Sequence, residues 1–327
     1  MVDGLDVRAI QDATQRVREN TARVVVGLDA PIEMMLVTLL CEGHVLLEDI
    51  PGIGKTTLAK ALSRSLGCTF KRLQFTPDLL PSDVTGVSIY NQRTQQFEFR
   101  PGPVFSQVLL VDEINRAGPR TQSALLEAMQ ERQVTVDGET RPLQRPFLVM
   151  ATQNPIELEG TFPLPEAQLD RFFMRLKLGY PTDEQERTIV HRFTAGDPMI
   201  ELEPVVNDKE ILQLGASCRL VYVHPVVEDY MLGLVKATRS NEALALGASP
   251  RGTLALYQAA QALAALRGRS YVIPEDVQQL AIPVLAHRLI PTAGQRLHAR
   301  SAEEILQSLI DQVPVPVEEA WEESPAS

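Results

Sequence analysis

The sequence predicts an α/β fold: a mostly parallel sheet with helices on both faces and two β-hairpin inserts, followed by an all-helical domain. Three observations support this prediction. Short apolar runs alternate with helical patterns between residues 44 and 180, which is the order of strand–helix–strand units. Two hairpin patterns interrupt that alternation, and the chain after Pro181 holds helical patterns only.

Five apolar runs are predicted as strands of the sheet. "HVLLE" (44–48) is short and bounded by polar residues, as a buried strand is. The other predicted strands follow at regular intervals, at 70–75, 108–113, 147–154 and 173–180. Apolar residues at helical spacing predict helices at 5–26, 32–43, 55–67 and 121–131.

Two further segments predict hairpins that a plain α/β sheet does not need. Residues 86–104 contain two β-rich arms around a polar turn. Residues 132–144 carry Asp137 and Gly138, a strong turn signal. We therefore expect both hairpins to be insertions that project from the sheet.

Pro181 marks the predicted domain boundary. Thr182 and Gln185 have the spacing of a capping box, which begins a helix. We expect an α/β domain over residues 1–181, a helical domain over 182–313, and a disordered, Pro- and Glu-rich acidic tail over 314–327. The predicted helices of the second domain are 183–194, 208–219, 225–240, 250–267 and 274–287.

Composition limits the classes of function. The chain has 327 residues, of which 44% are hydrophobic, so it can bury a sizeable core in two domains. Its net charge of −11 argues against non-specific nucleic-acid binding. The three cysteines show no metal or redox spacing, and no run approaches the roughly 20 apolar residues of a membrane span. We expect a cytoplasmic protein with no membrane insertion and no nucleic-acid partner.

The stretch "DIPGIGKTT" (49–57) predicts a phosphate-binding loop between a strand and a helix. Backbone N–H groups of such a loop and of the helix N-terminus face an anion. Lys55 would add charge for the outer phosphates, Thr56 would offer its hydroxyl to Mg²⁺, and we expect the unusual acid Asp49 to point away. The candidate loop residues are Asp49, Ile50, Pro51, Gly52, Ile53, Gly54, Lys55, Thr56 and Thr57.

The stretch "VLLVDEIN" (108–115) ends a predicted strand with two acids, Asp112 and Glu113. They would lie at the carboxyl ends of the strands, where open α/β sheets bind ligands. Asp112 is expected to hold Mg²⁺ together with Thr56, and Glu113 to polarise an attacking water. Asn154, after a further strand, could orient that water from the same edge.

Taken together, several segments resemble the MoxR family of AAA+ ATPases. They are "LLEDIPGIGKTTLAKAL", "FTPDLLPSDVTG", "RPGPVFSQVLLVDEINRAGPRTQSALLEAMQERQVTVDGE", "MATQNPIELEGTFPLPEAQLDRF" and "GASPRGTLAL". The resemblance spans nearly the whole chain and implies a P-loop NTPase fold of the AAA+ type, with the helical domain as its lid. An acid before Ile/Val-Pro-Gly is usual in this family, so Asp49 is a family variant rather than a decayed loop.

The resemblance also implies roles for single residues. Asn154 resembles the first sensor, and Arg251 of "SPR" the second sensor on the lid. Arg171 of "LDRF" resembles the arginine finger, which reaches the γ-phosphate of a neighbouring subunit. Val26 and Gly27 resemble the segment that contacts adenine. The rival candidates for the finger are Arg116, Arg120 and Arg175.

The function that the resemblance implies is ATP hydrolysis with Mg²⁺, used to remodel, mature or activate a partner protein. An arginine that acts in trans requires a ring of subunits, which we expect to be a hexamer. Members of this family often work with von Willebrand factor A domain proteins, so we expect a separate partner of that kind.

Three other functions stay open on the sequence alone. A chelatase motor subunit, which drives metal insertion into a tetrapyrrole, would share the core and both hairpins. A nucleic-acid-dependent motor is disfavoured, because the hairpins carry only scattered positive residues. A scaffold that binds ATP without turnover is disfavoured by the intact Lys55, Asp112, Glu113 and Arg171.

Overall fold

A computed structural model describes residues 5–48, 52–153, 160–194, 196–297 and 299–316. The chain divides into two compact units, which we describe separately. The first, the sheet unit, comprises residues 13–172 and 176–212. The second, the helical unit, comprises residues 1–12, 173–175 and 213–327. The boundary expected at Pro181 stays a prediction.

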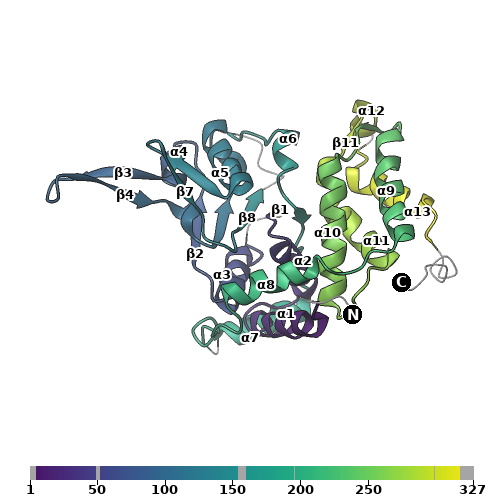
Figure 1. Ribbon diagram of the computed structural model, residues 1–327, viewed down its shortest axis with the longest axis horizontal. Helices are drawn as coiled ribbons and strands as arrows, with labels where there is room; N and C mark the ends of the chain where they lie inside the picture. The colour runs from purple at the N-terminus through teal and green to yellow at the C-terminus, as the bar shows by residue number, and fades with distance from the viewer. Residues whose placement is uncertain (1–4, 49–51, 154–159, 195, 298, 317–327) are drawn as a thin grey trace. The chain divides into compact units, whose positions relative to one another are not determined.

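The sheet consists of the five strands that the alternating apolar runs predicted, and their order is β2-β5-β8-β1-β9 (Figure 1). Strand β5 pairs in parallel with β2 and β8, and β8 pairs in parallel with β1. The three inner strands consist of buried apolar residues along most of their length, as expected for a sheet covered on both faces. The strands are β1 (Val45–Glu48), β2 (Phe70–Gln74), β5 (Val108–Asp112), β8 (Leu148–Gln153) and β9 (Met174–Leu176).

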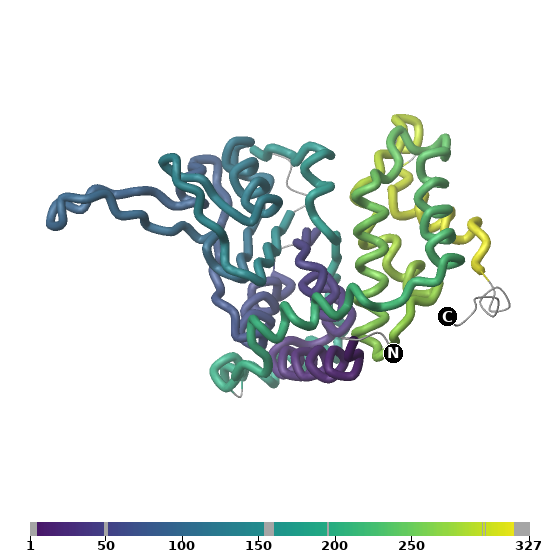
Figure 2. The backbone as a smooth tube through the Cα atoms, in the orientation of Figure 1, coloured from purple at the N-terminus to yellow at the C-terminus, as the bar shows by residue number. Residues whose placement is uncertain are grey.

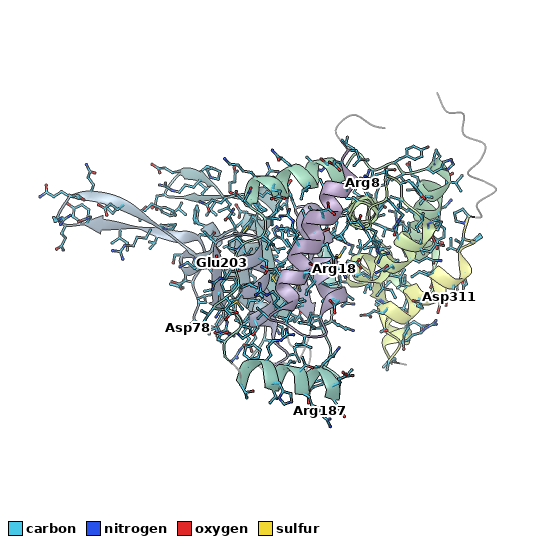
Figure 3. All side chains as sticks on the ribbon, turned by 90° about the horizontal axis from the view of Figure 1, so that it is seen from below. Arg8, Arg18, Asp78, Arg187, Glu203 and Asp311 are labelled. Carbon is cyan, nitrogen blue, oxygen red and sulfur yellow. The ribbon has the colours of Figure 1, made fainter. Side chains whose placement is uncertain are left out.

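Helices cover this sheet through apolar faces at helical spacing. In α3 (Lys55–Ser65), Leu58 and Leu62 are fully buried, and in α5 (Pro119–Glu131), Leu125 and Leu126 are fully buried. The other helices of this part of the chain are α1 (Val7–Ala22), α2 (Asp29–Leu40), α4 (Pro81–Thr85), α6 (Glu166–Leu169), α7 (Asp183–Thr194) and α8 (Asp208–Cys218). Figure 3 shows α7 with the side chain of Arg187 pointing outward from it.

Both predicted hairpins are present. Strands β3 (Gly86–Asn91) and β4 (Gln96–Pro101) form the first, and β6 (Gln133–Val136) and β7 (Glu139–Pro142) form the second. The tube in Figure 2 shows the first hairpin projecting far beyond the sheet. Its base requires glycine, because a Cβ on Gly86, whose φ is +94°, would lie 2.4 Å from a backbone oxygen.

The helical unit contains the helices predicted after residue 208 and three features that were not predicted. Its core is rich in alanine along α10, which allows the helices to pack closely. The unpredicted features are helices α12 (Ala293–Leu297) and α13 (Ala302–Gln312) and a two-stranded ribbon of β10 (Leu244–Leu246) and β11 (Ile290–Pro291). The predicted helices are α9 (Pro225–Ser240), α10 (Pro250–Leu266) and α11 (Pro274–Leu285). None of the described helices has the length and apolarity to cross a membrane.

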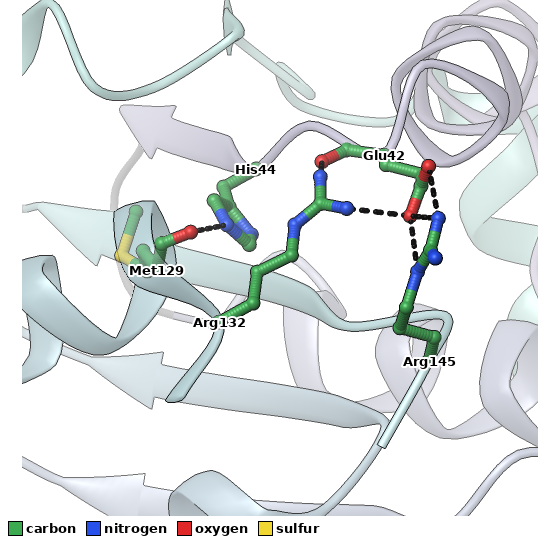
Figure 4. Close-up of polar contacts among 5 residues, drawn as sticks. All are labelled: Glu42, His44, Met129, Arg132 and Arg145. Atoms are coloured by element: carbon green, nitrogen blue, oxygen red, sulfur yellow. Dashed lines mark hydrogen bonds and ion pairs between the residues drawn. The ribbon is translucent and has the colours of Figure 1, made fainter. Parts of the chain in front are cut away.

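A cluster of charged residues lies at the edge of the sheet where the inner strands begin (Figure 4). Glu42, just before β1, accepts hydrogen bonds from Arg132 and from Arg145 at distances of 2.6–2.8 Å. His44 is buried between them and β8: Val149 N–H donates to its Nδ1 at 3.1 Å, and its Nε2 lies 3.0 Å from the Met129 oxygen. Every polar atom of the imidazole therefore has a partner in its neutral form.

Candidate nucleotide-binding site

The loop after β1 has the backbone that a phosphate site needs. Gly52 and Gly54 have φ of +89° and +87°, a region that residues with a Cβ rarely adopt. Gly54 is the N-cap of α3, and its carbonyl accepts from Leu58 N–H at 2.9 Å. The first backbone N–H groups of α3 thus have no partner within the helix and can bind an anion. The predicted residues Asp49, Ile50 and Pro51 lie outside the described residues.

A pocket of about 210 Å³ opens at this loop. It brings the loop and the acidic end of β5 together, as the sequence predicted for Lys55, Thr56, Asp112 and Glu113. Its remaining lining includes three polar residues that the sequence analysis did not single out. The full lining is Gly52, Gly54, Lys55, Thr56, Thr57, Arg72, Gln74, Asp112, Glu113 and Thr152.

Asp112 and Glu113 are held by side chains from strand β2 and from the turn that follows β5. Arg72 Nε donates to Asp112 Oδ2 at 2.6 Å. Gln74 Nε2 and Arg116 Nη1 donate to Glu113 Oε2 at 2.8 and 2.9 Å. Glu113 itself has a left-handed backbone, with φ of 56°, which directs the chain into the turn that carries Arg116.

Thr152, at the end of β8, joins the two acids. Its hydroxyl accepts from Glu113 N–H at 2.9 Å and lies 3.4 Å from Asp112 Oδ1. The ends of β5 and β8 are therefore fixed against each other beside the loop. Asn154, the predicted first sensor two residues later, lies outside the described residues.

A second, larger and more apolar pocket of about 390 Å³ continues from the first. The two pockets share Gly52, Gly54 and Thr57, so the glycine loop lies between them. The lining of the second pocket is Val24, Val25, Val26, Leu28, Gly52, Ile53, Gly54, Thr57, Tyr180, Pro181, Glu186, Ile189 and Phe193. A flat apolar group next to a phosphate group would fit this pair of pockets.

Helix α7 forms one wall of the second pocket and is bonded to the segment after α1 near its own C-terminal end. Arg192 Nη1 donates to the Ala22 and Val25 oxygens at 2.7 and 3.3 Å. Gly27 does not line the pocket; a Cβ there would lie 2.4 Å from the Gln185 side chain, so Gly27 allows α7 to approach. Val26, by contrast, lines the pocket, and its contact with adenine stays a prediction.

The two predicted arginines outside these pockets lie in different units. Arg171 follows α6 in the sheet unit, is half-buried, and forms no ion pair with any residue that the structure describes. Arg251 lies in the first turn of α10, in the helical unit. Two rival fingers have partners in their own chain, since Arg116 pairs with Glu113 and Arg175 with Glu303.

The pocket residues that the sequence analysis missed had only weak signals. Arg72 and Gln74 alternate along β2, so both can point to one face, but a strand pattern alone does not say which. Ile189 and Phe193 belong to the helical domain predicted after Pro181, and Tyr180 lies directly before that boundary, so no sequence pattern connects them with the loop.

The residues present fit a nucleoside triphosphate with magnesium. Positive-φ glycines and the N-terminal N–H groups of α3 suit phosphate, and Lys55 adds a positive charge. A hydroxyl at Thr56 and a carboxylate at Asp112 are the oxygen ligands that magnesium prefers. The apolar pocket beyond the loop suits a base.

Comparisons with known proteins agree with this geometry over both units. The family model "ATPase family associated with various cellular activities (AAA)" matches residues 44–174, and an AAA lid domain model matches residues 236–309. The chain is 49% identical over 300 residues to the uncharacterized protein YeaC of Bacillus subtilis, with 92% of this chain and 94% of that protein covered. It is 45% identical over 303 residues to Chaperone MoxR1 of Mycobacterium tuberculosis, with 90% and 80% covered. A crystal structure of a candidate ATPase from Cytophaga hutchinsonii matches with a TM-score of 0.89 at 38% identity, covering 95% of this chain and 97% of that one.

Proposed function

The chain belongs to the MoxR family of AAA+ ATPases, and from this premise we propose that it hydrolyses ATP with Mg²⁺ to remodel a partner protein. The observation that carries the proposal is the single pocket shared by the glycine loop and the acidic end of β5. Phosphoryl transfer depends mainly on positioning and on charge around the terminal phosphate, and this pocket supplies groups for both.

Within one subunit, the places of the side chains support the following roles. Lys55 and the first N–H groups of α3 bind the phosphates, while Val26, Ile53 and the apolar pocket hold the base. Thr56 and Asp112 would hold magnesium, which on binding neutralises charge on the phosphates. Glu113 accepts a proton from water through Oε1, because Gln74 and Arg116 both donate to Oε2.

The proposed hydrolysis is completed by groups that these two pockets do not contain. Asn154 is the first sensor, Arg251 the second sensor on a lid that we place at residues 182–313, and Arg171 a finger that acts on a neighbouring subunit. A ring, expected to be a hexamer, is required for such a finger. An arginine supplied in trans can add roughly 10³- to 10⁵-fold in rate.

The partner is proposed from the family rather than from the pocket. The name of MoxR1 says that it is a chaperone, which supports a remodelling role for this chain. We propose a separate protein with a von Willebrand factor A domain as client or cofactor. Affinity capture with an ATP-locked variant, followed by identification of the retained protein, tests this part.

The hydrolysis is tested with Glu113→Gln. We expect phosphate release to fall by about 10²- to 10⁴-fold, because the amide cannot take a proton, while binding of MgATP persists. Glu127→Gln, at an exposed position of α5, is the matched control and should behave as wild type. Equal phosphate release from wild type and Glu113→Gln would instead favour a scaffold that binds without turnover.

The trans role of Arg171 is tested by mixing two inactive variants. Arg171→Ala and Glu113→Gln subunits should each be nearly inactive alone. In mixed rings, a site with an intact Glu113 can meet an intact Arg171, so part of the activity should return. No recovery in rings shown to be mixed would contradict the assignment.

A further inference from the structure

Arg72 is a basic residue of the phosphate pocket for which the proposed mechanism has no role so far. It lies on β2, the strand at one side of the sheet, and its backbone aligns with Leu110 rather than with Asp112. Its side chain extends along the strand direction to reach Asp112. Together with Lys55, it supplies the positive charge among the described lining residues.

The hydrogen bond of Arg72 to Asp112 leaves its two Nη atoms available to donate to a ligand. It donates to Asp112 through Nε at 2.6 Å, and half of its side chain, 51%, remains exposed. Its Nη atoms, which carry four of the five N–H donors of a guanidinium, have no partner among the described residues. Arg269 shows the alternative: both of its Nη atoms donate to the buried Asp276.

The order of the two pockets places Arg72 at the far end of a bound nucleotide. The glycine loop, through Gly52, Gly54 and Thr57, is common to both pockets. Arg72 lines the polar pocket and is absent from the apolar one. With the base in the apolar pocket, Arg72 therefore lies on the side of the loop that receives the terminal phosphate.

Resting on the proposed function, we propose that Arg72 binds the terminal phosphate of ATP in its own subunit and so distinguishes ATP from ADP. Asp112 holds Nε, which fixes the plane of the guanidinium, and the Nη groups donate to the phosphate oxygens. Arginine suits this task because its planar fork matches phosphate oxygens. ADP has no γ-phosphate and would miss this contact.

The ion pair between Arg72 and Asp112 is also compatible with a role in which Arg72 weakens nucleotide binding. The experiment must distinguish this role from the proposed one. A guanidinium 2.6 Å from Asp112 could mainly compete with magnesium for that carboxylate. In that case, removal of Arg72 would strengthen the binding of magnesium nucleotides. In our proposal, removal of Arg72 weakens the binding of triphosphate.

The test is equilibrium binding of fluorescent β,γ-imido ATP and fluorescent ADP, each with excess Mg²⁺, to the full chain. The variants are Arg72→Gln, Arg72→Lys and, as control, Arg187→Gln, whose side chain is exposed and points outward from α7 (Figure 3). Thermal unfolding without nucleotide checks that each variant is folded. Arg72→Lys keeps the charge without the fork, and it gives a second measurement if Arg72→Gln proves unstable.

We expect Arg72→Gln to raise the Kd of the ATP analogue by about 10- to 100-fold, the value of a hydrogen bond to a charged group. The Kd of ADP should change less than about threefold, and Arg72→Lys should lie between Arg72→Gln and wild type. Equal effects on both nucleotides, no effect, or tighter binding would each overturn the proposal. If the wild-type chain binds neither nucleotide, the proposed function itself fails, which is a different result.

Discussion

The sheet carries a cluster of carboxylates and arginines at each of its two edges. At the carboxyl ends of the strands, Asp112 and Glu113 meet Arg72 and Arg116. At the amino ends, Glu42 meets Arg132 and Arg145, as Figure 4 shows. Exposure does not separate the two clusters: the carboxylates of Asp112 and Glu42 are 13% and 11% exposed, and Arg72 and Arg145 are 51% and 53% exposed.

The number of donors in use does separate them. Arg145 binds Glu42 through both Nε and Nη2, and Arg132 binds it through Nη1 while Nη2 binds its backbone oxygen. Arg72 binds Asp112 through Nε. We infer that the Glu42 cluster is a structural clamp that joins α2, α5 and the segment before β8, whereas Arg72 of the Asp112 cluster has donors that a ligand can use.

The largest effect is expected for a substitution at the carboxyl ends of the strands, beside the pocket. Asp112→Asn removes the charge that would attract magnesium, so we expect Mg²⁺-dependent phosphate release to fall by about 100-fold or more. The midpoint of thermal unfolding without nucleotide should hardly move, because a partly exposed ion pair contributes only about 0–1 kcal/mol to stability. Phosphate-release assays and thermal unfolding on the same sample measure both quantities. A large loss of stability would instead show that Asp112 has a structural role like that of Glu42.

The next largest effect is a dependence of stability on pH, which comes from His44 beside the Glu42 cluster. Burial, the largest cause, lowers the pKa of His44 from 6.5 to about 4; Arg132 lowers it further, and the hydrogen bond to Met129 opposes both. The unfolded chain therefore takes up a proton near pH 6.5, while the folded chain does so only near pH 4. Stability from His44 is complete above pH 6.5 and is lost as pH falls toward 4, by about 3 kcal/mol in total.

Urea unfolding at several pH values from 7.5 to 4.5 measures this loss. His44→Asn should flatten the pH dependence, although it also lowers stability at neutral pH. His191→Gln, at an exposed position of α7, should leave the pH dependence as in wild type. If His44→Asn kept the full wild-type slope, His44 would not be the group that titrates.

Local periodicity and end signals predicted most of the fold. Helix α7 begins at Asp183 as expected, because Thr182 and Gln185 form the capping box: Thr182 N–H donates to Gln185 Oε1 at 2.9 Å. Helix α13 was missed although Ser301 and Glu304 form a similar box. The ribbon of β10 and β11 was missed because each strand has too few residues for a pattern.

The candidate site was predictable where the residues are adjacent in sequence and unpredictable where they meet through the fold. The loop and the Asp112–Glu113 pair are short motifs with a known local geometry. The contact of Arg72 with Asp112 depends on the pairing of β2 with β5 across 40 residues. The base pocket likewise depends on Arg192, which reaches the Ala22 oxygen from 170 residues away.

A smaller effect tests the clamp itself. Glu42→Gln removes the negative charge between Arg132 and Arg145, so we expect the free energy of unfolding to fall by about 2 kcal/mol. The value lies below that of a fully buried pair because Arg145 is half exposed. Nucleotide affinity should stay as in wild type, since Glu42 lies at the opposite edge of the sheet from the pocket. Urea unfolding and nucleotide titration of the same variant measure both quantities. A fall in nucleotide affinity without a fall in stability would contradict a structural role for the Glu42 cluster.

The smallest effect is expected when arginine is replaced by lysine at each end of the strands, which keeps the charge and changes the geometry. Arg145→Lys cannot reproduce the paired Nε and Nη2 bonds to Glu42, so we expect a loss of about 1 kcal/mol in unfolding free energy. Arg72→Lys is the matched change beside the pocket, where the ion pair with Asp112 has one bond at 2.6 Å, and its unfolding free energy should stay within about 0.5 kcal/mol of wild type. Chemical unfolding at low salt measures both changes. Equal losses at the two edges would mean that the number of arginine donors in use does not distinguish a structural cluster from a binding one.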